Sequence, residues 1–227
     1  MTPVQTFVAL VTKPRQAFTE LEKNPRFAAP MIVLLAANIA LLLWFYATVD
    51  VDSLINHILA SRGINAAQRA QIGGLMTRNT LMVSALFTGI VSIVVTQVVE
   101  AFYFYFVYTF FEVQRTFRQW FAFTWWCSLP QLITIVAAVV MIVSGRSPAS
   151  AGVLSPFSLN ELFFHFDLAD SGYSLLNSIS LVQLLTMLLM VIGAHTWSKR
   201  SWASSVVVVI LPRLLFYGVW AWFAFRS

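Results

Sequence analysis

The stretch SIVVTQVVEAFYFYFVY (Ser92–Tyr108) is almost wholly apolar and carries one carboxylate, Glu100, near its middle. An unpaired charge in hydrocarbon is costly, so Glu100 needs a partner or a function. A second charge stands in a similar position, because Arg213 follows Pro212 inside the last apolar segment of the chain. The stretch therefore predicts a membrane helix with a buried polar contact.

Composition supports a membrane protein. Of the 227 residues, 59% are hydrophobic and 10% are charged, and the mean hydropathy is +0.79. Soluble domains carry about 25% charged residues, so this chain falls outside that class. The predicted fold class is an all-α, polytopic membrane protein of five transmembrane helices with an N-terminal amphipathic interfacial helix.

Five apolar runs give the predicted domain organisation. Residues 1–28 form an amphipathic cytoplasmic leader, and residues 29–227 form a five-helix transmembrane domain. The second span is about 46 Å long at about 1.5 Å per residue, longer than a hydrocarbon core of about 30 Å, so we expect it to project into the cytoplasm. The spans are expected at about 29–48, 81–111, 119–144, 175–196 and 203–224.

The leader has apolar residues at helical spacing, with basic residues at the other positions. Pro14 suits the first turn of a helix, and Thr12 is the expected cap. Two alternatives stay open: a helix in the membrane interface, drawn to anionic headgroups, or a strap packed across the cytoplasmic face. The apolar positions are Phe7, Leu10, Val11, Phe18 and Leu21.

Charge placement predicts the orientation. With the N-terminus inside, eight basic residues lie on the cytoplasmic side and five, all arginines, on the other. This bias favours a multi-pass membrane protein with its N-terminus cytoplasmic and its C-terminus outside. Basic residues scattered at span ends also argue against nucleic acid as a partner. The interfacial basic residues are Lys13, Arg15, Lys23, Arg26, Arg115, Arg118, Lys199 and Arg200.

Depth pairs the two intramembrane charges. Glu100 and Arg213 each lie about 15–17 Å from the inner end of their spans at the helical rise, so we expect an ion pair. The pair either fixes the register of the helices or lines a polar cavity for an ion, proton or lipid headgroup. Pro212 also frees a backbone carbonyl, that of Val208, at this level. Thr96, Gln97 and Tyr103 complete the candidate intramembrane polar site.

The aromatic run FYFYFVYTFF (Phe102–Phe111) favours an interfacial belt and helix packing over a binding groove.

Two segments on the outer side are also predicted to form helices. Asn65–Arg78 is predicted as a polar helical approach to the second span. Ser158–Phe166 is predicted as a short helix on the outer interface with Ser158 as its cap.

Motifs for catalysis are missing from the sequence. It has no nucleotide-binding loop, no GxSxG and no HExxH motif, so we expect no enzyme activity. Cys127 is the only cysteine, which excludes an intramolecular disulfide and a cysteine-cluster metal site. We expect no cofactor and no metal.

We also expect no cleavable signal peptide, because the first apolar run begins near Ala28 without a following cleavage site.

Several loose motifs occur in a familiar order. They are KPRQAFTEL (Lys13–Leu21), Asn24-Pro25, Pro30, TFRQ (Thr116–Gln119), Pro130, LLMVIGAH (Leu188–His195) and SKRSWAS (Ser198–Ser204). In this order the chain resembles bacterial members of the Yip-domain family (Ypt-interacting proteins) over nearly its whole length. The chain departs from the pattern before TFRQ, where relatives often have glycines and this chain has Phe111-Glu112-Val113-Gln114.

The resemblance implies a five-helix integral membrane protein with a cytoplasmic N-terminus. Eukaryotic relatives bind prenylated Rab-type GTPases, which a bacterial member would lack as partners. The resemblance therefore implies a protein of the bacterial cell inner (plasma) membrane. We expect a non-enzymatic membrane protein that organises protein partners or lipids, with membrane lipids, other membrane proteins or a second copy of itself as partners. The alternatives are a small transporter or channel with its polar site at Glu100 and Arg213, or a lipid-binding protein.

Overall fold

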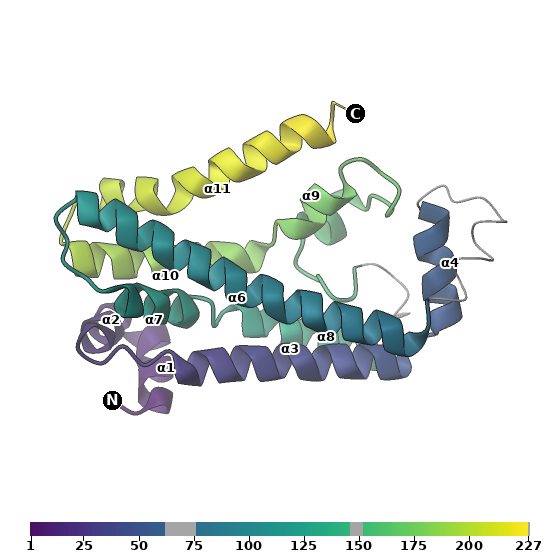
Figure 1. Cartoon of the computed structure of the whole chain (residues 1–227), viewed down its shortest axis with the longest axis horizontal. Helices are drawn as coiled ribbons and strands as arrows, with labels where there is room; N and C mark the ends of the chain where they lie inside the picture. Colours follow the sequence, from purple (N-terminus) through teal and green to yellow (C-terminus); the bar gives the residue numbers. More distant parts are fainter. Residues whose placement is uncertain (62–75, 146–151, 227) are drawn as a thin grey trace. The chain divides into compact units, whose positions relative to one another are not determined.

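The computed structural model describes residues 1–61, 76–145 and 152–226. Its regular elements are helices, and an isolated bridge joins Ser158 to Ser180. The predicted all-α fold class is confirmed. In chain order the helices are α1 (Pro3–Thr12), α2 (Pro14–Lys23), α3 (Ala28–Thr48), α4 (Val51–Ser61), α6 (Arg78–Phe110), α7 (Phe117–Cys127), α8 (Gln131–Val143), the π-helical turn η1 (Asn160–Phe164), α9 (Tyr173–Ser178), α10 (Leu181–Ser198) and α11 (Trp202–Ala224) (Figure 1).

Five helical segments of the described chain are long and apolar enough to cross a membrane, as predicted. They are α3, α6, α7 with α8, α10 and α11. At about 1.5 Å per residue, the 33 residues of α6 measure about 50 Å and the 21 residues of α3 about 32 Å. The chain is a multi-pass membrane protein.

The third and fourth spans differ in detail from the predicted helices. The third span is interrupted by turns at Ser128, Leu129 and Pro130, because a proline has no N–H to donate inside a helix. The fourth begins at Leu181 and not near residue 175, because α9 ends at an extended Ile179. The hydroxyl of Ser180 then accepts the N–H of Val182 (3.2 Å) in the first turn of α10.

The chain forms two compact units. Unit 1 consists of Met1–Leu35, Ser92–Gln131 and Gln183–Phe216, and unit 2 of Ala36–Val91, Leu132–Val182 and Tyr217–Ser227. The predicted intramembrane site and the eight predicted interfacial basic residues all belong to unit 1.

The core of unit 1 is aromatic. Trp120 lies parallel to Tyr108, with ring centroids 4.9 Å apart, and contacts Trp197 at 5.0 Å. Gly193 lies so close to this core that a Cβ would come within 2.5 Å of Phe123 and 2.8 Å of Phe18, so a side chain there would displace the leader. The largest fully buried aromatic residues are Phe18, Phe104, Tyr108, Trp120, Phe123, Trp125 and Trp197.

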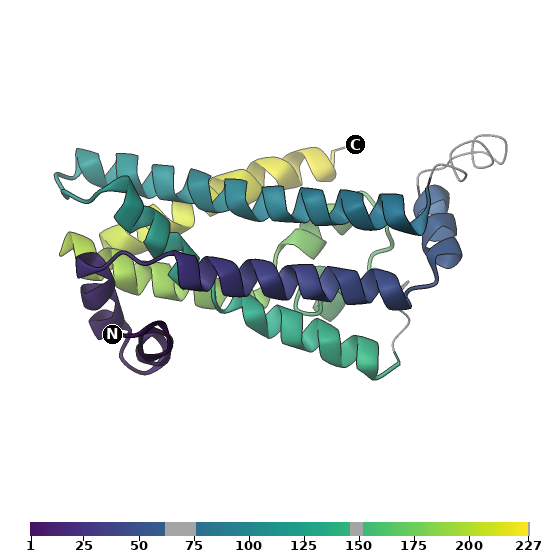
Figure 2. The same cartoon turned by 60° about the horizontal axis from the view of Figure 1, so that its bottom comes forward.

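The leader folds as two short helices, α1 and α2, that pack on each other before α3 begins (Figures 1 and 2). A capping box starts α1, since the Thr2 hydroxyl accepts the N–H of Gln5 (3.3 Å) and the Gln5 side chain accepts that of Thr2 (2.8 Å). Pro14 opens α2 as predicted. The predicted Thr12 cap is wrong: the cap position is Lys13, and the Thr12 hydroxyl bonds back to the Val8 carbonyl (2.9 Å) within α1.

In unit 2, side chains form hydrogen bonds with backbone groups at the turns. The Arg78 guanidinium donates to the carbonyls of Tyr46 and Val49, which terminate α3. The Ser158 hydroxyl accepts the N–H of Glu161 (3.1 Å), but the cap position of η1 is Leu159 and not the predicted Ser158, and η1 is shorter than the predicted helix. Most of the predicted approach Asn65–Arg78 lies outside the described residues.

Candidate functional site

The two intramembrane charges meet in unit 1. The Nη2 group of Arg213 on α11 donates to Oε1 of Glu100 on α6. Both side chains keep part of their surface exposed, 21% for Arg213 and 24% for Glu100. Arg213 also donates to the Val209 carbonyl (3.1 Å) and lies 3.3 Å from the Met190 sulfur. The predicted contact is present, and its role as a functional site stays a prediction.

A second bond joins the same two helices one turn away. The hydroxyl of Tyr103 on α6 donates to the carbonyl of Val208 on α11 (2.7 Å). In a regular helix that carbonyl would accept the N–H of residue 212, but Pro212 has none. Tyr103 therefore supplies the donor that the proline removes, and Val208 itself is buried. The freed carbonyl expected from the sequence is occupied by a side chain of the neighbouring helix.

Gln97 and Thr96 differ in placement. Gln97 is buried and donates to the Ser128 hydroxyl (2.7 Å), which donates in turn to the Thr124 carbonyl (3.0 Å). Thr96 is exposed on the surface of unit 1. The structure thus brings Gln97 to the break after α7, while Thr96 lies on the outer side of α6.

The aromatic run divides by face. Phe104 and Tyr108 are buried against Trp120, whereas Phe102, Phe106 and Phe110 are exposed. Positions four apart on a helix share a side, so one row of the run builds the core and the other forms an outer surface. Aromatic packing, predicted from the sequence, accounts for the buried row.

The leader is fastened to the rest of unit 1 through α2. Ala17, Phe18 and Leu21 are buried, and Phe18 contacts Phe123 with centroids 5.5 Å apart. The indole N–H of Trp197 donates to the Phe18 carbonyl (2.8 Å), and the amide of Gln119 donates to the Glu22 carbonyl (2.8 Å). For α2, this packing favours the strap among the two alternatives drawn from the sequence.

Three of the predicted interfacial arginines make contacts within unit 1. Arg115 forms an ion pair with Glu22 (2.6 Å). Arg200 donates to the Phe111 carbonyl (3.1 Å), and its guanidinium lies over the Phe111 ring. The guanidinium of Arg15 lies 5.3 Å from the ring of Trp202. Five more basic residues present exposed side chains, namely Lys13, Lys23, Arg26, Arg118 and Lys199.

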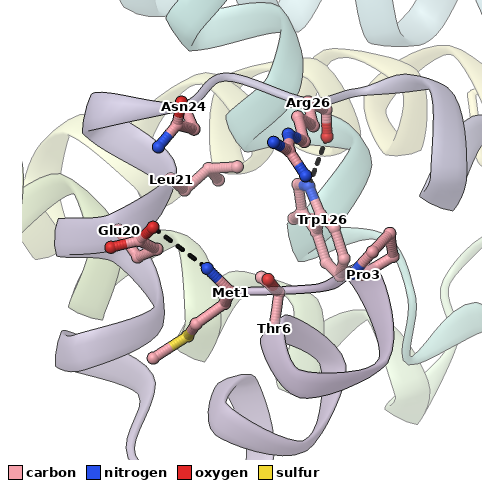
Figure 3. A pocket seen from close by; sticks show the side chains of 8 residues that line it. All are labelled: Met1, Pro3, Thr6, Glu20, Leu21, Asn24, Arg26 and Trp126. Atoms are coloured by element: carbon pink, nitrogen blue, oxygen red, sulfur yellow. Dashed lines mark hydrogen bonds and ion pairs between the residues drawn. The ribbon is translucent and has the colours of Figure 1, made fainter.

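A small pocket opens between the leader and α7, with a volume of about 20 Å³ (Figure 3). The amino group of Met1 donates to Glu20 (3.1 Å) there, and this hydrogen bond holds the pKa of Glu20 below its usual range. The indole of Trp126 donates to the Arg26 carbonyl (2.7 Å) on the other side of the pocket. Such a volume has room for about one water molecule. The pocket is too small for an organic ligand.

Comparison with protein families identifies the chain. The model of the Yip1 domain matches residues 8–223, which is most of the sequence. The chain belongs to the Yip1 domain family. No curated protein and no solved structure matches this Yip1-domain chain. The resemblance drawn from the motifs is thereby confirmed at the level of the family.

The site of this Yip1-domain protein consists of an ion pair and side-chain hydrogen bonds within the spans. Among the described residues, no group of three or more His, Cys, Asp or Glu could hold a metal ion. Sequence reasoning missed Ser128, Met190 and Glu22 as partners of the nominated residues. A signal existed for Ser128, which stands two residues before Pro130 at the break of the third span. For Met190 and Glu22 the sequence carries no comparable signal.

Proposed function

We propose that this Yip1-domain protein is a non-enzymatic membrane protein that organises protein partners or lipids at the cytoplasmic face of the inner (plasma) membrane. The observation that carries the proposal is the fastening of the leader and the two predicted inner loops onto one packed aromatic core. The Arg115–Glu22 pair ties the α6–α7 loop to α2, and the Trp197 and Arg200 bonds tie in the end of α10 and the turn after it. A fixed surface with exposed basic residues suits recognition better than catalysis.

Two further points support this function. Proteins of the family are membrane proteins that interact with other proteins. The eight-to-five distribution of basic residues favours a cytoplasmic N-terminus and an outer C-terminus. Partners of suitable chemistry are anionic lipids, acidic segments of other membrane proteins or a second copy of the chain.

Photo-crosslinking in intact membranes tests the proposal. A photoreactive amino acid at the exposed position Arg118 should yield discrete adducts, with protein or with anionic lipid. The matched control is Val219 on α11, which is 58% exposed and apolar. Adducts from Arg118 should weaken when Lys13, Lys23 and Lys199 are changed to Gln. Identical products from Arg118 and Val219 would contradict the proposal.

A second candidate function is transport through the Glu100–Arg213 region. The presence of a charged pair within membrane-spanning helices is the observation that favours it. Proteoliposomes with a pH-sensitive dye inside test this candidate for protons. A flux above that of empty vesicles, lost in Glu100→Gln and kept in Glu22→Gln, would establish transport and displace the first proposal.

A further inference from the structure

The two leader helices present opposite surfaces. The apolar side chains of α2 face the core of unit 1, and its exposed positions are polar or charged, for example Arg15, Gln16 and Thr19. On α1 the side that packs inward holds Thr6, Ala9 and Leu10. Its outward side is apolar and holds Val4, Phe7, Val8 and Val11, which are 73%, 44%, 53% and 74% exposed.

These four residues form one continuous stripe. Their spacing of i, i+3, i+4 and i+7 places them on one face of α1, and the helix PVQTFVALVT contains no charged residue. A stripe of this kind is costly in water, because it exposes large apolar side chains side by side. Something apolar therefore covers it.

The neighbours of α1 fix its level relative to the spans. At its start, Pro3 and Thr6 line the pocket with Arg26 and Trp126, and Arg26 stands two residues before the first span (Figure 3). Just past its end, Arg15 lies over Trp202, the first residue of the last span. Both ends of α1 are therefore located where apolar spans begin.

From these contacts we infer that α1 lies in the headgroup–acyl boundary of the bilayer with the stripe Val4, Phe7, Val8 and Val11 inserted, while α2 fastens it to the bundle. The surface that covers this stripe is the membrane. Lys13 and Arg15, directly after the helix, match the anionic headgroups of that surface, and Trp202 is a residue typical of the same layer. Of the two alternatives for the leader, the helix in the membrane interface applies to α1 and the strap applies to α2. This inference does not depend on the proposed function.

Site-directed spin labelling in the full-length protein tests the inference. A nitroxide at Val8→Cys should be accessible to oxygen and shielded from a water-soluble nickel chelate in phosphatidylglycerol–phosphatidylcholine vesicles. The matched control is Thr19→Cys, at an exposed position of α2, where the nickel chelate should collide several-fold more often. The unsubstituted protein gives the baseline, because its only cysteine, Cys127, is fully buried. If that baseline shows labelling, Cys127→Ala replaces it.

Two results would overturn the inference. A label at Val8 that collides with the nickel chelate as often as expected for an exposed label at Thr19 would place α1 in water. Spin–spin broadening at Val8 that persists at high lipid-to-protein ratio would show a second copy of the chain covering the stripe. A label at Val11→Cys should repeat the Val8 result, which guards against a local effect of one substitution. Crosslinking from Arg118 stays unaffected by either outcome, so failure here is distinguishable from failure of the proposed function.

Discussion

Two carboxylate–guanidinium pairs of similar exposure occur in unit 1, and they differ in what surrounds them. Glu100 and Arg213 join α6 and α11 within spans, with side chains 24% and 21% exposed. Glu22 and Arg115 join the leader to the α6–α7 loop, with side chains 31% and 21% exposed. The chemistry of the contact is the same, but one pair is enclosed by apolar helices and the other lies beyond their ends.

The comparison teaches that surroundings decide what an ion pair contributes. Between apolar spans the loss of one partner leaves a charge with little solvent to replace it. At the ends of the helices, water and salt replace a lost partner cheaply, so the leader pair contributes little by itself. The leader is held mainly by the burial of Phe18 and Leu21, which are 0% and 3% exposed.

Breaking the span pair should have the largest effect. We expect Arg213→Leu to destabilise the protein by about 3 kcal/mol, because Glu100 would be left among apolar helices. Thermal unfolding in lipid nanodiscs measures the loss. The control is Arg226→Leu, whose guanidinium lies over the Trp222 ring at the end of the chain and should matter little.

The double variant Glu100→Leu/Arg213→Leu should recover much of that loss, because both charges are removed together. Additive losses in the two single variants and the double variant would show that the two side chains do not stabilise each other.

The next effect concerns the bond beside the span pair. Tyr103→Phe should cost about 1–2 kcal/mol, because the buried Val208 carbonyl would lose its donor. Pro212→Ala restores a backbone N–H for the same carbonyl, so Tyr103→Phe should cost less in that background. The same unfolding assay measures both. A full cost in the Pro212→Ala background would mean that the phenol acts by packing and not through its hydroxyl.

The span pair was predictable because depth in a helical membrane protein can be counted along the chain. About ten residues separate each charge from the inner end of its helix, and the rise per residue converts this to a common level. Counting residues gives the depth of a side chain in the membrane but not the side of the helix from which it projects. Thr96 and Gln97 lie at nearly the same depth, yet only Gln97 faces Ser128, because adjacent residues point about 100° apart.

The leader pair was not predictable in this way. Glu22 and Arg115 meet only because α2 folds back on the start of α7, and that packing depends on Phe18 entering the space left by Gly193. The break at Ser128–Pro130 shows a similar limit. Pro130 is visible in the sequence, but the same residue type leaves α11 continuous at Pro212, where Tyr103 replaces the lost donor.

The loop that carries Arg115 stores strain that a substitution can release. Glu112 has φ of +61°, a left-handed conformation that favours glycine, at the point where the N–H of Val113 returns to the Tyr108 carbonyl (2.9 Å). Glu112→Gly should therefore stabilise the protein by about 1 kcal/mol. Glu112→Ala, which removes the carboxylate and keeps the Cβ, is the control. Equal gains in both variants would assign the effect to charge and not to backbone.

The leader pair itself should show the smallest effect. Glu22→Gln is expected to cost about 0.5 kcal/mol at low salt and less at high salt, because the pair is partly exposed and screened. The same salt series should leave the cost of Arg213→Leu nearly unchanged, since apolar helices exclude the ions. Parallel salt dependence of the two variants would mean that solvent reaches Glu100 as freely as Glu22. The difference between the pairs would then lie in geometry and not in their surroundings, and a water-accessible path to Glu100 would gain its first support.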